Sequence, residues 1–267
     1  MLTLIVIIIQ VCIAIFFIRY VIRHDRGSKE PRQGLRAAIG FGFLSIPLVF
    51  VTNFILGKLP TIGPAVSINS EVLRAGGYPL EFLFVAMILV GIIEEAAKAI
   101  PLAIFIWKKP YFNELTDGLF YFGISGVIFS VTESILYTFT FGSGIGVMRI
   151  IITPFLHTGF SMWFGYFLAR RKVTGRGTWQ VPVSLIFAMV LHGLYNFGLA
   201  SKNLGATLLS LLIAISLNIG VFLLYHYAQK RDSRLQLSAD GVNNFCRSCG
   251  QPNPDHTLYC EHCGQRT

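Results

Sequence analysis

Seven apolar stretches, each long enough to cross a lipid bilayer as a helix, constrain the fold of this chain more than any other feature. The hydrocarbon core of a membrane is about 30 Å thick, and a helix needs roughly 20 apolar residues to span it. Only 13% of the residues are charged and the mean hydropathy is +0.63, which excludes an ordinary soluble enzyme. We therefore predict an all-α polytopic membrane protein with about seven transmembrane helices. The stretches are Leu2–Ile22, Leu35–Leu56, Leu80–Trp107, Leu115–Phe139, Arg149–Ala169, Val181–Ala200 and Leu204–Tyr227.

The basic residues are divided unevenly between the two ends of these stretches. Seventeen of the 22 Lys and Arg residues fall on one side, four (Lys58, Arg74, Arg149 and Lys202) fall on the other, and Lys98 lies inside a stretch. Basic loops stay in the cytoplasm, so we predict a multi-pass protein of the cell membrane with its N terminus outside and its C terminus inside. The first stretch is too long for a signal-peptide core and is expected to be retained. Basic inner loops facing anionic lipids also account for the net charge of +9 without nucleic acid.

The C-terminal tail carries a cysteine pattern that is typical of zinc binding. Cys246 and Cys249 form one CxxCG motif, Cys260 and Cys263 form a second, and ten residues separate the two pairs. Four thiolates complete a tetrahedral structural zinc site, which leaves no position for a substrate. Two disulfides are the alternative, and a reducing cytoplasm disfavours them. The tail resembles a zinc ribbon, and we predict a membrane domain over 1–228, a linker over 229–244 and a cytoplasmic zinc ribbon over 245–267.

Ionisable residues lie at the centres of four consecutive stretches. Such residues are costly inside a membrane and indicate a functional site. With a rise of 1.5 Å per residue, Glu133 lies about 9 to 10 Å from the outer end, the two histidines about 12 Å and Glu94 about 18 to 21 Å. These depths allow one shared site in the outer half of the membrane. The residues are Glu94, Glu95 and Lys98 in the third stretch, Glu133 in the fourth, His157 in the fifth, and His192 with Asn196 in the sixth.

The chemistry of this set favours hydrolysis. Two imidazoles and a carboxylate are a familiar ligand set for catalytic zinc, and a further Glu beside the metal-bound water can act as general base. Glu94 and Glu95 point about 100° apart on a helix, so one can face the site while the other holds a neighbouring helix. Lys98 lies on the same face and can neutralise either carboxylate. Asn196, one turn after His192, can orient a substrate carbonyl or donate to an oxyanion.

In this order on successive helices, these residues resemble the PrsW family of intramembrane proteases. The similarity covers roughly residues 35–227 and includes Glu94-Glu95-x-x-Lys98, Phe129-x-x-x-Glu133, His157-Thr158-Gly159 and His192-x-x-x-Asn196. The wider group includes CAAX prenyl proteases and bacteriocin-processing enzymes, with the patterns EExxxR, FxxxH and HxxxN. Lys98 comes one residue earlier than the Arg of that pattern, and Glu133 stands where it has His. Both departures favour the PrsW family.

The resemblance implies an intramembrane endopeptidase that cleaves a membrane-associated protein near the outer face, as PrsW-like proteins cleave anti-sigma factors. It implies that Glu94 or Glu95 activates water, with Lys98 and Asn196 in the catalytic set. Glu133, His157 and His192 match the remaining positions and are the predicted ligands of a second zinc. Glutamate-dependent hydrolysis without metal is the alternative mechanism in the wider group. The zinc ribbon lies outside the shared region and is expected to recruit a cytoplasmic partner or the inner tail of the substrate.

Two other classes of function remain open from the sequence. The first is a proton-coupled transporter in which the buried Glu and His residues relay protons. Carriers often contain internal repeats, and none is visible here. The second is a non-catalytic sensor that presents the zinc ribbon and tolerates Glu94→Gln or His192→Ala. A separation of more than about 10 Å between the paired glutamates and both histidines would exclude a single site.

Overall fold

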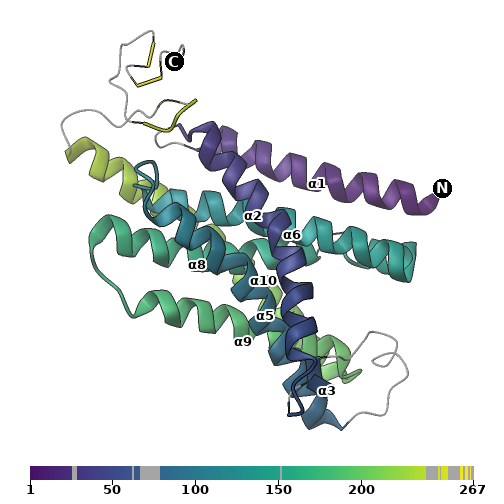
Figure 1. Cartoon of the computed structure of the whole chain (residues 1–267). Coiled ribbons are helices and arrows are strands. Elements are labelled where there is room, and N and C mark those ends of the chain that lie inside the picture. Colours follow the sequence, from purple (N-terminus) through teal and green to yellow (C-terminus); the bar gives the residue numbers. More distant parts are fainter. Residues whose placement is uncertain are drawn as a thin grey trace.

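The long helices coincide with the predicted apolar stretches (Figure 1). The computed structural model describes residues 1–25, 29–61, 63–66, 79–150 and 152–238, with side chains to 232, and 246, 248–251, 259–260, 262–263 and 265 of the tail. The fifth stretch begins three residues before its helix, and each of the others lies within one helix. The helices are α1 (Leu2–His24), α2 (Arg32–Leu56), α3 (Gly63–Val66), α5 (Leu80–Trp107), α6 (Leu115–Phe141), α7 (Ser143–Met148), α8 (Ile152–Thr174), α9 (Gln180–Ala200) and α10 (Leu204–Ser238).

The helical architecture confirms the predicted fold class. Within the described residues, five helices are long and apolar enough to cross a membrane, namely α1, α2, α6, α9 and α10. The other two long helices, α5 and α8, carry polar side chains of the predicted site. Arg74 and the linker residues 239–244 lie outside the described part of the chain.

Helix α6 lies at the centre of the bundle, and 78% of its membrane-spanning window is buried. It packs most extensively against α8 and also contacts α2 and α1, while α5 packs mainly against α9. Two glycines allow the close contact between α5 and α9. A Cβ atom on Gly91 would lie 2.4 Å from the carbonyl oxygen of Met189, and one on Gly193 would lie 2.7 Å from Cα of Ile88. Because Gly193 follows His192 directly, this contact sets the distance between α9 and the glutamates of α5.

In the predicted topology, α6 begins on the inner side of the membrane. Carboxylate side chains fix this end of the helix. Asp117 and Glu114 form a capping box at the start of the helix, which accounts for an acidic residue in its first turn. Asp232, on the extension of α10 beyond its apolar stretch, accepts hydrogen bonds from the backbone N–H groups of Leu115 (2.9 Å) and Thr116 (2.8 Å). Its side chain therefore satisfies two N–H groups that a helix start leaves unpaired. Helix α10 thus continues past residue 228, and Asp232 on this extension contacts the start of α6.

Candidate active site

Three helices bring four of the predicted site residues together in one buried cluster, and Glu133 on α6 contacts it through His157. Glu95 and Lys98 come from α5, His157 comes from α8 and His192 comes from α9, and each is at most 3% exposed. The two imidazole rings lie 4.9 Å apart between centroids and are nearly perpendicular, at 86°. These side chains therefore lie within contact distance of one another, well inside the separation of about 10 Å that would have excluded a single site.

Glu95 is the carboxylate that holds the cluster together. Its Oε1 atom lies 2.5 Å from Nζ of Lys98 and 2.8 Å from Nδ1 of His192. Lys98 also lies 3.1 Å from Nδ1 of His157 and 4.9 Å above the ring of Phe129. Since a carboxylate paired with an ammonium group accepts hydrogen bonds, we assign the hydrogen of His192 to Nδ1. Nε2 of His192 is then an acceptor that faces away from Glu95.

Glu94 presents an unpartnered oxygen to that imidazole. Its Oε2 atom is buried, has no hydrogen-bond partner among the described residues, and lies 3.7 Å from Nε2 of His192. Two acceptor atoms that face each other in this way leave room for a cation or a hydrogen-bond donor between them. Among the described buried atoms without a partner, this is the one carboxylate oxygen, and its position beside an imidazole suits a cation or a hydrogen-bond donor.

Glu94, His157 and His192 form a set that can hold a metal ion. One ligand atom from each residue lies within 4.8 Å of the other two. The donor set, one carboxylate and two imidazoles, is that of many catalytic zinc sites, and the orphaned Oε2 atom of Glu94 also fits a metal. This set differs from the sequence prediction in one residue, because it contains Glu94 in place of Glu133.

The structure pairs Glu133 with Arg149, which was predicted to be a cation on the outer side of the membrane. The guanidinium NH2 group of Arg149 contacts Oε2 of Glu133, and the same oxygen lies 3.2 Å from Nε2 of His157. Arg149 precedes α8, since α8 begins at Ile152 and not at the start of the apolar stretch. One sequence signal pointed to Arg149, because a basic residue next to an apolar stretch on the side that is poor in Lys and Arg needs an explanation.

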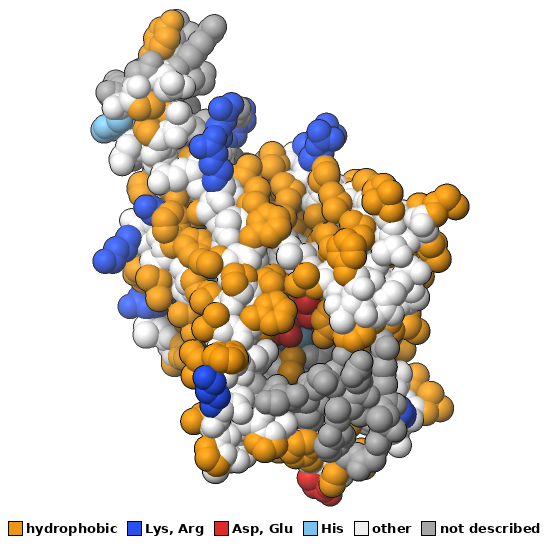
Figure 2. All heavy atoms as spheres, turned by 45° about the vertical axis from the view of Figure 1, so that its right-hand side comes forward, with side chains coloured by type: hydrophobic (Ala, Val, Ile, Leu, Met, Phe, Trp, Pro, Cys, Tyr) orange, Lys and Arg blue, Asp and Glu red, His pale blue; other side chains and the backbone are white. Residues whose placement is uncertain are grey.

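The cluster is close to the molecular surface on one face. Side-chain exposure is 11% for Glu94 and 13% for Glu133. Figure 2 shows acidic side chains in a recess of a face that is otherwise largely hydrophobic. Asn196, one turn after His192 on α9, is partly buried and makes no hydrogen bond with any described residue.

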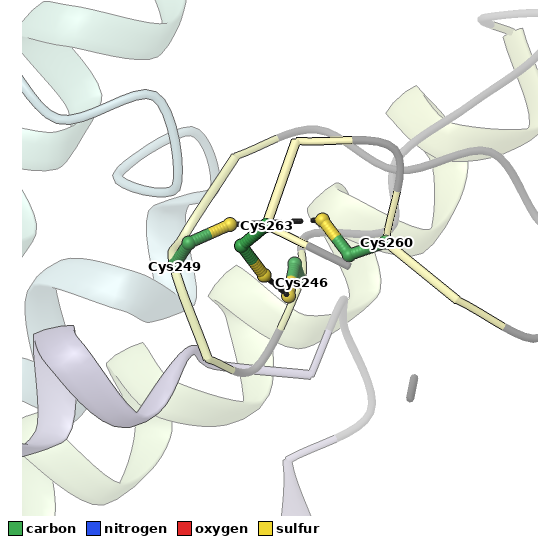
Figure 3. Close-up of side chains that lie close together, drawn as sticks. All are labelled: Cys246, Cys249, Cys260 and Cys263. Carbon is green, nitrogen blue, oxygen red and sulfur yellow. Dashed lines mark hydrogen bonds between the residues drawn. The ribbon is translucent and has the colours of Figure 1, made fainter. Parts of the chain in front are cut away.

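The four tail cysteines form a second cluster (Figure 3). The Sγ atoms of Cys246 and Cys263 lie 3.5 Å apart, and those of Cys249 and Cys260 lie 3.6 Å apart. A disulfide needs a separation of about 2.05 Å, whereas four sulfurs about 2.3 Å from one tetrahedral ion lie roughly 3.8 Å from one another. These separations therefore match a shared ion, and all four thiols are free.

The described residues of the two CxxC motifs make matching backbone hydrogen bonds. The N–H of Ser248 points to Sγ of Cys246 and the N–H of His262 points to Sγ of Cys260, each at 3.4 Å. Gly250 has φ of +73°, a left-handed conformation that glycine adopts without strain. Its Cα hydrogens face Tyr111 of the membrane domain, since a Cβ at this position would lie 3.1 Å from the ring. The first motif thus packs against the loop between α5 and α6.

A helical membrane bundle with buried glutamates, histidines and a lysine at the junction of four helices belongs to the class of polytopic membrane enzymes with an intramembrane site. The model of the PrsW family of intramembrane metalloproteases matches residues 30–224. The chain therefore belongs to this family, and it is an intramembrane protease. The matched region contains every predicted residue of the intramembrane site and excludes α1 and the cysteines of the tail.

Individual relatives agree with this assignment. The chain is 25% identical over 218 residues to Protease PrsW of Clostridioides difficile (strain 630), which covers 79% of this chain and 84% of that protein. It is 25% identical over 192 residues to Protease PrsW of Bacillus subtilis (strain 168), which covers 71% of this chain and 80% of that protein. Protease PrsW of Halalkalibacterium halodurans is 31% identical over 149 residues, which covers 55% of this chain and 67% of that protein. No solved structure matches the chain.

Proposed function

We propose that the protein hydrolyses a peptide bond of a membrane-associated protein in the outer half of the membrane, with Glu94, His157 and His192 at the reacting centre. The observation that carries this proposal is the buried, unpartnered Oε2 atom of Glu94, which faces Nε2 of His192 at 3.7 Å. The family resemblance points to an anti-sigma factor as the substrate. The partial exposure of Glu94 (11%) and Glu133 (13%) suits a substrate that arrives within the bilayer.

The proposed topology has seven membrane crossings, the N terminus outside and the C terminus in the cytoplasm. Contacts between predicted inner segments support it. Lys172 after the fifth stretch donates to the carbonyl of Lys109 after the third at 2.6 Å, and Tyr225 near the end of the seventh stretch donates to the carbonyl of His24 at 3.2 Å. Arg149 lies at the opposite end of α8 from Lys172, as the proposal requires.

Glu94, His157 and His192 would hold the metal ion that the family name implies. Bound there, the ion would supply a water of lowered pKa and polarise the carbonyl of the substrate. In the tail, we propose a structural zinc held by Cys246, Cys249, Cys260 and Cys263, consistent with their spacing. The tail zinc has four protein ligands and supplies no open position for chemistry.

The residues of the chain divide into those that react and those that position. Glu94 offers its free oxygen to a positive charge, either a proton from the reacting water or a metal ion. Glu95 accepts from Nδ1 of His192 and so turns Nε2 of that ring toward Glu94. Lys98 neutralises Glu95. Asn196, whose amide is not engaged by any described residue, is placed to donate to the substrate carbonyl oxygen as negative charge develops there.

The proposal is tested by cleavage in native membranes. Vesicles that contain the wild type or Glu94→Gln are incubated with the membrane proteins of the same cell, and new N termini are identified by mass spectrometry. We expect new N termini in transmembrane or outer juxtamembrane segments with the wild type alone. Identical sets for both proteins would refute proteolysis at this site, and proton uptake that depends on Glu94 would then favour the carrier.

Metal content separates the two mechanisms. A protein with all four tail cysteines changed to Ser is compared with the same protein carrying His157→Ala and His192→Ala, by elemental analysis. About one zinc in the first and none in the second is the result expected for a metal centre. No zinc in the first, together with cleavage that Glu94→Gln abolishes, would establish glutamate-dependent hydrolysis instead.

A further inference from the structure

We infer that Arg149 is a positioning residue of the intramembrane site, and that helix α1, outside the family region, holds it in place through α7. Arg149 contacts Glu133, Glu133 contacts His157, and a backbone carbonyl just before Arg149 is bonded to Gln10 of α1. This inference rests on the proposed function, since it assigns Arg149 to the same reacting centre.

Arg149 binds α6 through three side chains on one face of that helix. Its NH2 group contacts Glu133, its Nε atom donates to Oγ of Ser134 at 3.3 Å, and its guanidinium lies 4.1 Å from the ring centre of Tyr137. Three separate contacts define the orientation of the planar guanidinium group, which a flexible ammonium group would not share. The side chain is 19% exposed, so it lies at the edge of the cluster and not in its centre.

The charges of the cluster explain why Glu133 needs this partner. Glu95 is already paired with Lys98, and Glu94 has no described cationic partner that is permanently charged. Glu133 would therefore add a third carboxylate near two others in an apolar surround, where an unpaired charge is costly. Arg149 compensates that charge and holds Oε2 of Glu133 within 3.2 Å of Nε2 of His157. The orientation of His157 thus depends on Arg149 through Glu133.

Helix α1 reaches this pair through one buried glutamine. Gln10 is 0% exposed and donates from Nε2 to Oγ1 of Thr138 on α6 and to the carbonyl of Gly146 on α7, both at 3.2 Å. The same Gly146 carbonyl accepts from the backbone N–H of Arg149 at 3.2 Å. Gln10 and Arg149 therefore share one acceptor, so the position of α1 sets the position of the residue that holds Glu133.

Gly146 makes this contact close. A Cβ atom there would lie 2.5 Å from Oγ1 of Thr138 and 2.8 Å from Cγ1 of Val6 on α1. Helix α7, which joins α6 to α8, is therefore packed between α6 and α1. Helix α1 lies outside residues 30–224, which the family model matches, and it contacts the turn that carries Arg149.

The experiment is a double-mutant cycle on the full-length protein in proteoliposomes, with a membrane-anchored reporter that carries a cleavage sequence found in the vesicle experiment. The variants are Arg149→Gln, Glu133→Gln and the combination of both, and kcat and KM are measured for each. Lys58→Gln removes an exposed cation that lies over Phe54 and serves as the matched control. Arg149→Lys tests whether charge alone is enough, and gel filtration tests whether each variant is folded.

We expect Arg149→Gln to lower kcat about 10- to 100-fold with little change in KM, as for other residues that orient a site through a second side chain. In the Glu133→Gln background, Arg149→Gln should lower kcat by no more than about 2-fold, because the interaction between the two side chains is already lost. Arg149→Lys should recover part of the rate, and Lys58→Gln should match the wild type. Gln10→Leu, which leaves every charge in place, should lower kcat about 2- to 10-fold.

Two results would overturn the inference alone. One is an Arg149→Gln rate within about 3-fold of the wild type while Glu94→Gln is inactive. The other is a loss of kcat on Arg149→Gln that is as large in the Glu133→Gln background as in the wild type. That result would show that Arg149 does not act through Glu133. A wild type that cleaves no better than Glu94→Gln would instead refute the proposed function, and the inference with it.

Discussion

Oε1 of Glu95 lies 2.8 Å from Nδ1 of His192 and so joins α5 to α9 across the site, while the neighbouring Glu94 keeps a free oxygen. Two adjacent glutamates thus have different partners. Glu95 is an ion-paired positioning group, and Glu94 is available to react.

We expect Glu95→Gln to destabilise the protein and Glu94→Gln to leave it folded but inactive. Glu95→Gln leaves Lys98 buried without its carboxylate, which costs about 3 to 5 kcal/mol in comparable buried pairs. Glu94→Gln removes no described hydrogen bond. Thermal unfolding of the purified variants measures the difference, and Glu95→Gln/Lys98→Met is the control that should recover stability. Equal melting temperatures for the two single variants would contradict this division.

We expect Gly193→Ala to separate α5 from α9 and to abolish activity. The added methyl group would lie 2.7 Å from Cα of Ile88, a backbone atom that cannot move without its helix. Overpacking of this kind costs about 1 to 3 kcal/mol or more. Gly220→Ala on α10 is the matched control, because a Cβ there meets nothing within 4 Å and Ala is the better helix former. A Gly193→Ala protein with the melting temperature and cleavage rate of the wild type would show that the close contact is dispensable.

We expect the tail to hold one zinc that is lost when Cys246 and Cys249 are both changed to Ser. Loss of two of four thiolates should lower zinc content by about one ion per chain in elemental analysis, and Cys12→Ser on α1 should leave it unchanged. A truncation for the same purpose should end after Ser238, because Asp232 caps α6. Unchanged zinc in the double variant, or a disulfide found by mass spectrometry, would refute the zinc ribbon.

We expect Glu30→Gln to weaken the dependence of stability on pH. Burial and the nearby Asp117 carboxylate raise the pKa of Glu30 well above its usual value, and Tyr121 donates a hydrogen bond to it. A carboxyl group with a raised folded pKa contributes stability at low pH that is lost as pH rises from about 4.3, its unfolded pKa, through the folded value.

Glu30→Gln keeps an acceptor for Tyr121 without a charge, so its melting temperature should exceed that of the wild type at pH 8 and approach it near pH 4. Glu81→Gln, at an exposed position of α5, is the control and should follow the wild type. A constant difference between Glu30→Gln and the wild type at every pH would contradict the shifted titration.

Most of the fold was predictable because its determinants are local. Hydrophobicity over about 20 residues defines a membrane helix wherever it lies in the chain, and the observed long helices agree with the predicted stretches. The end of α10 was not predictable in this way. Residues 229–238 are mostly polar and continue the helix. Asp232, on that extension, bonds to the start of α6, which lies more than 100 residues earlier in the chain.

The residues of the site could also be recognised in the sequence, because charged and imidazole side chains inside membrane helices are rare. The rise of 1.5 Å per residue places these side chains at similar depths in the membrane. The sequence by itself determined which residues lie at a shared depth and can form one site: Glu94, Glu95, Lys98, Glu133, His157, His192 and Asn196. Only the tertiary structure decided which of these side chains pair with each other. The pairing of Glu95 with Lys98 and His192, and of Glu133 with Arg149, depends on helix rotation and on distances of a few ångströms. Those distances follow from close glycine contacts between helices, which spacing along one helix does not encode.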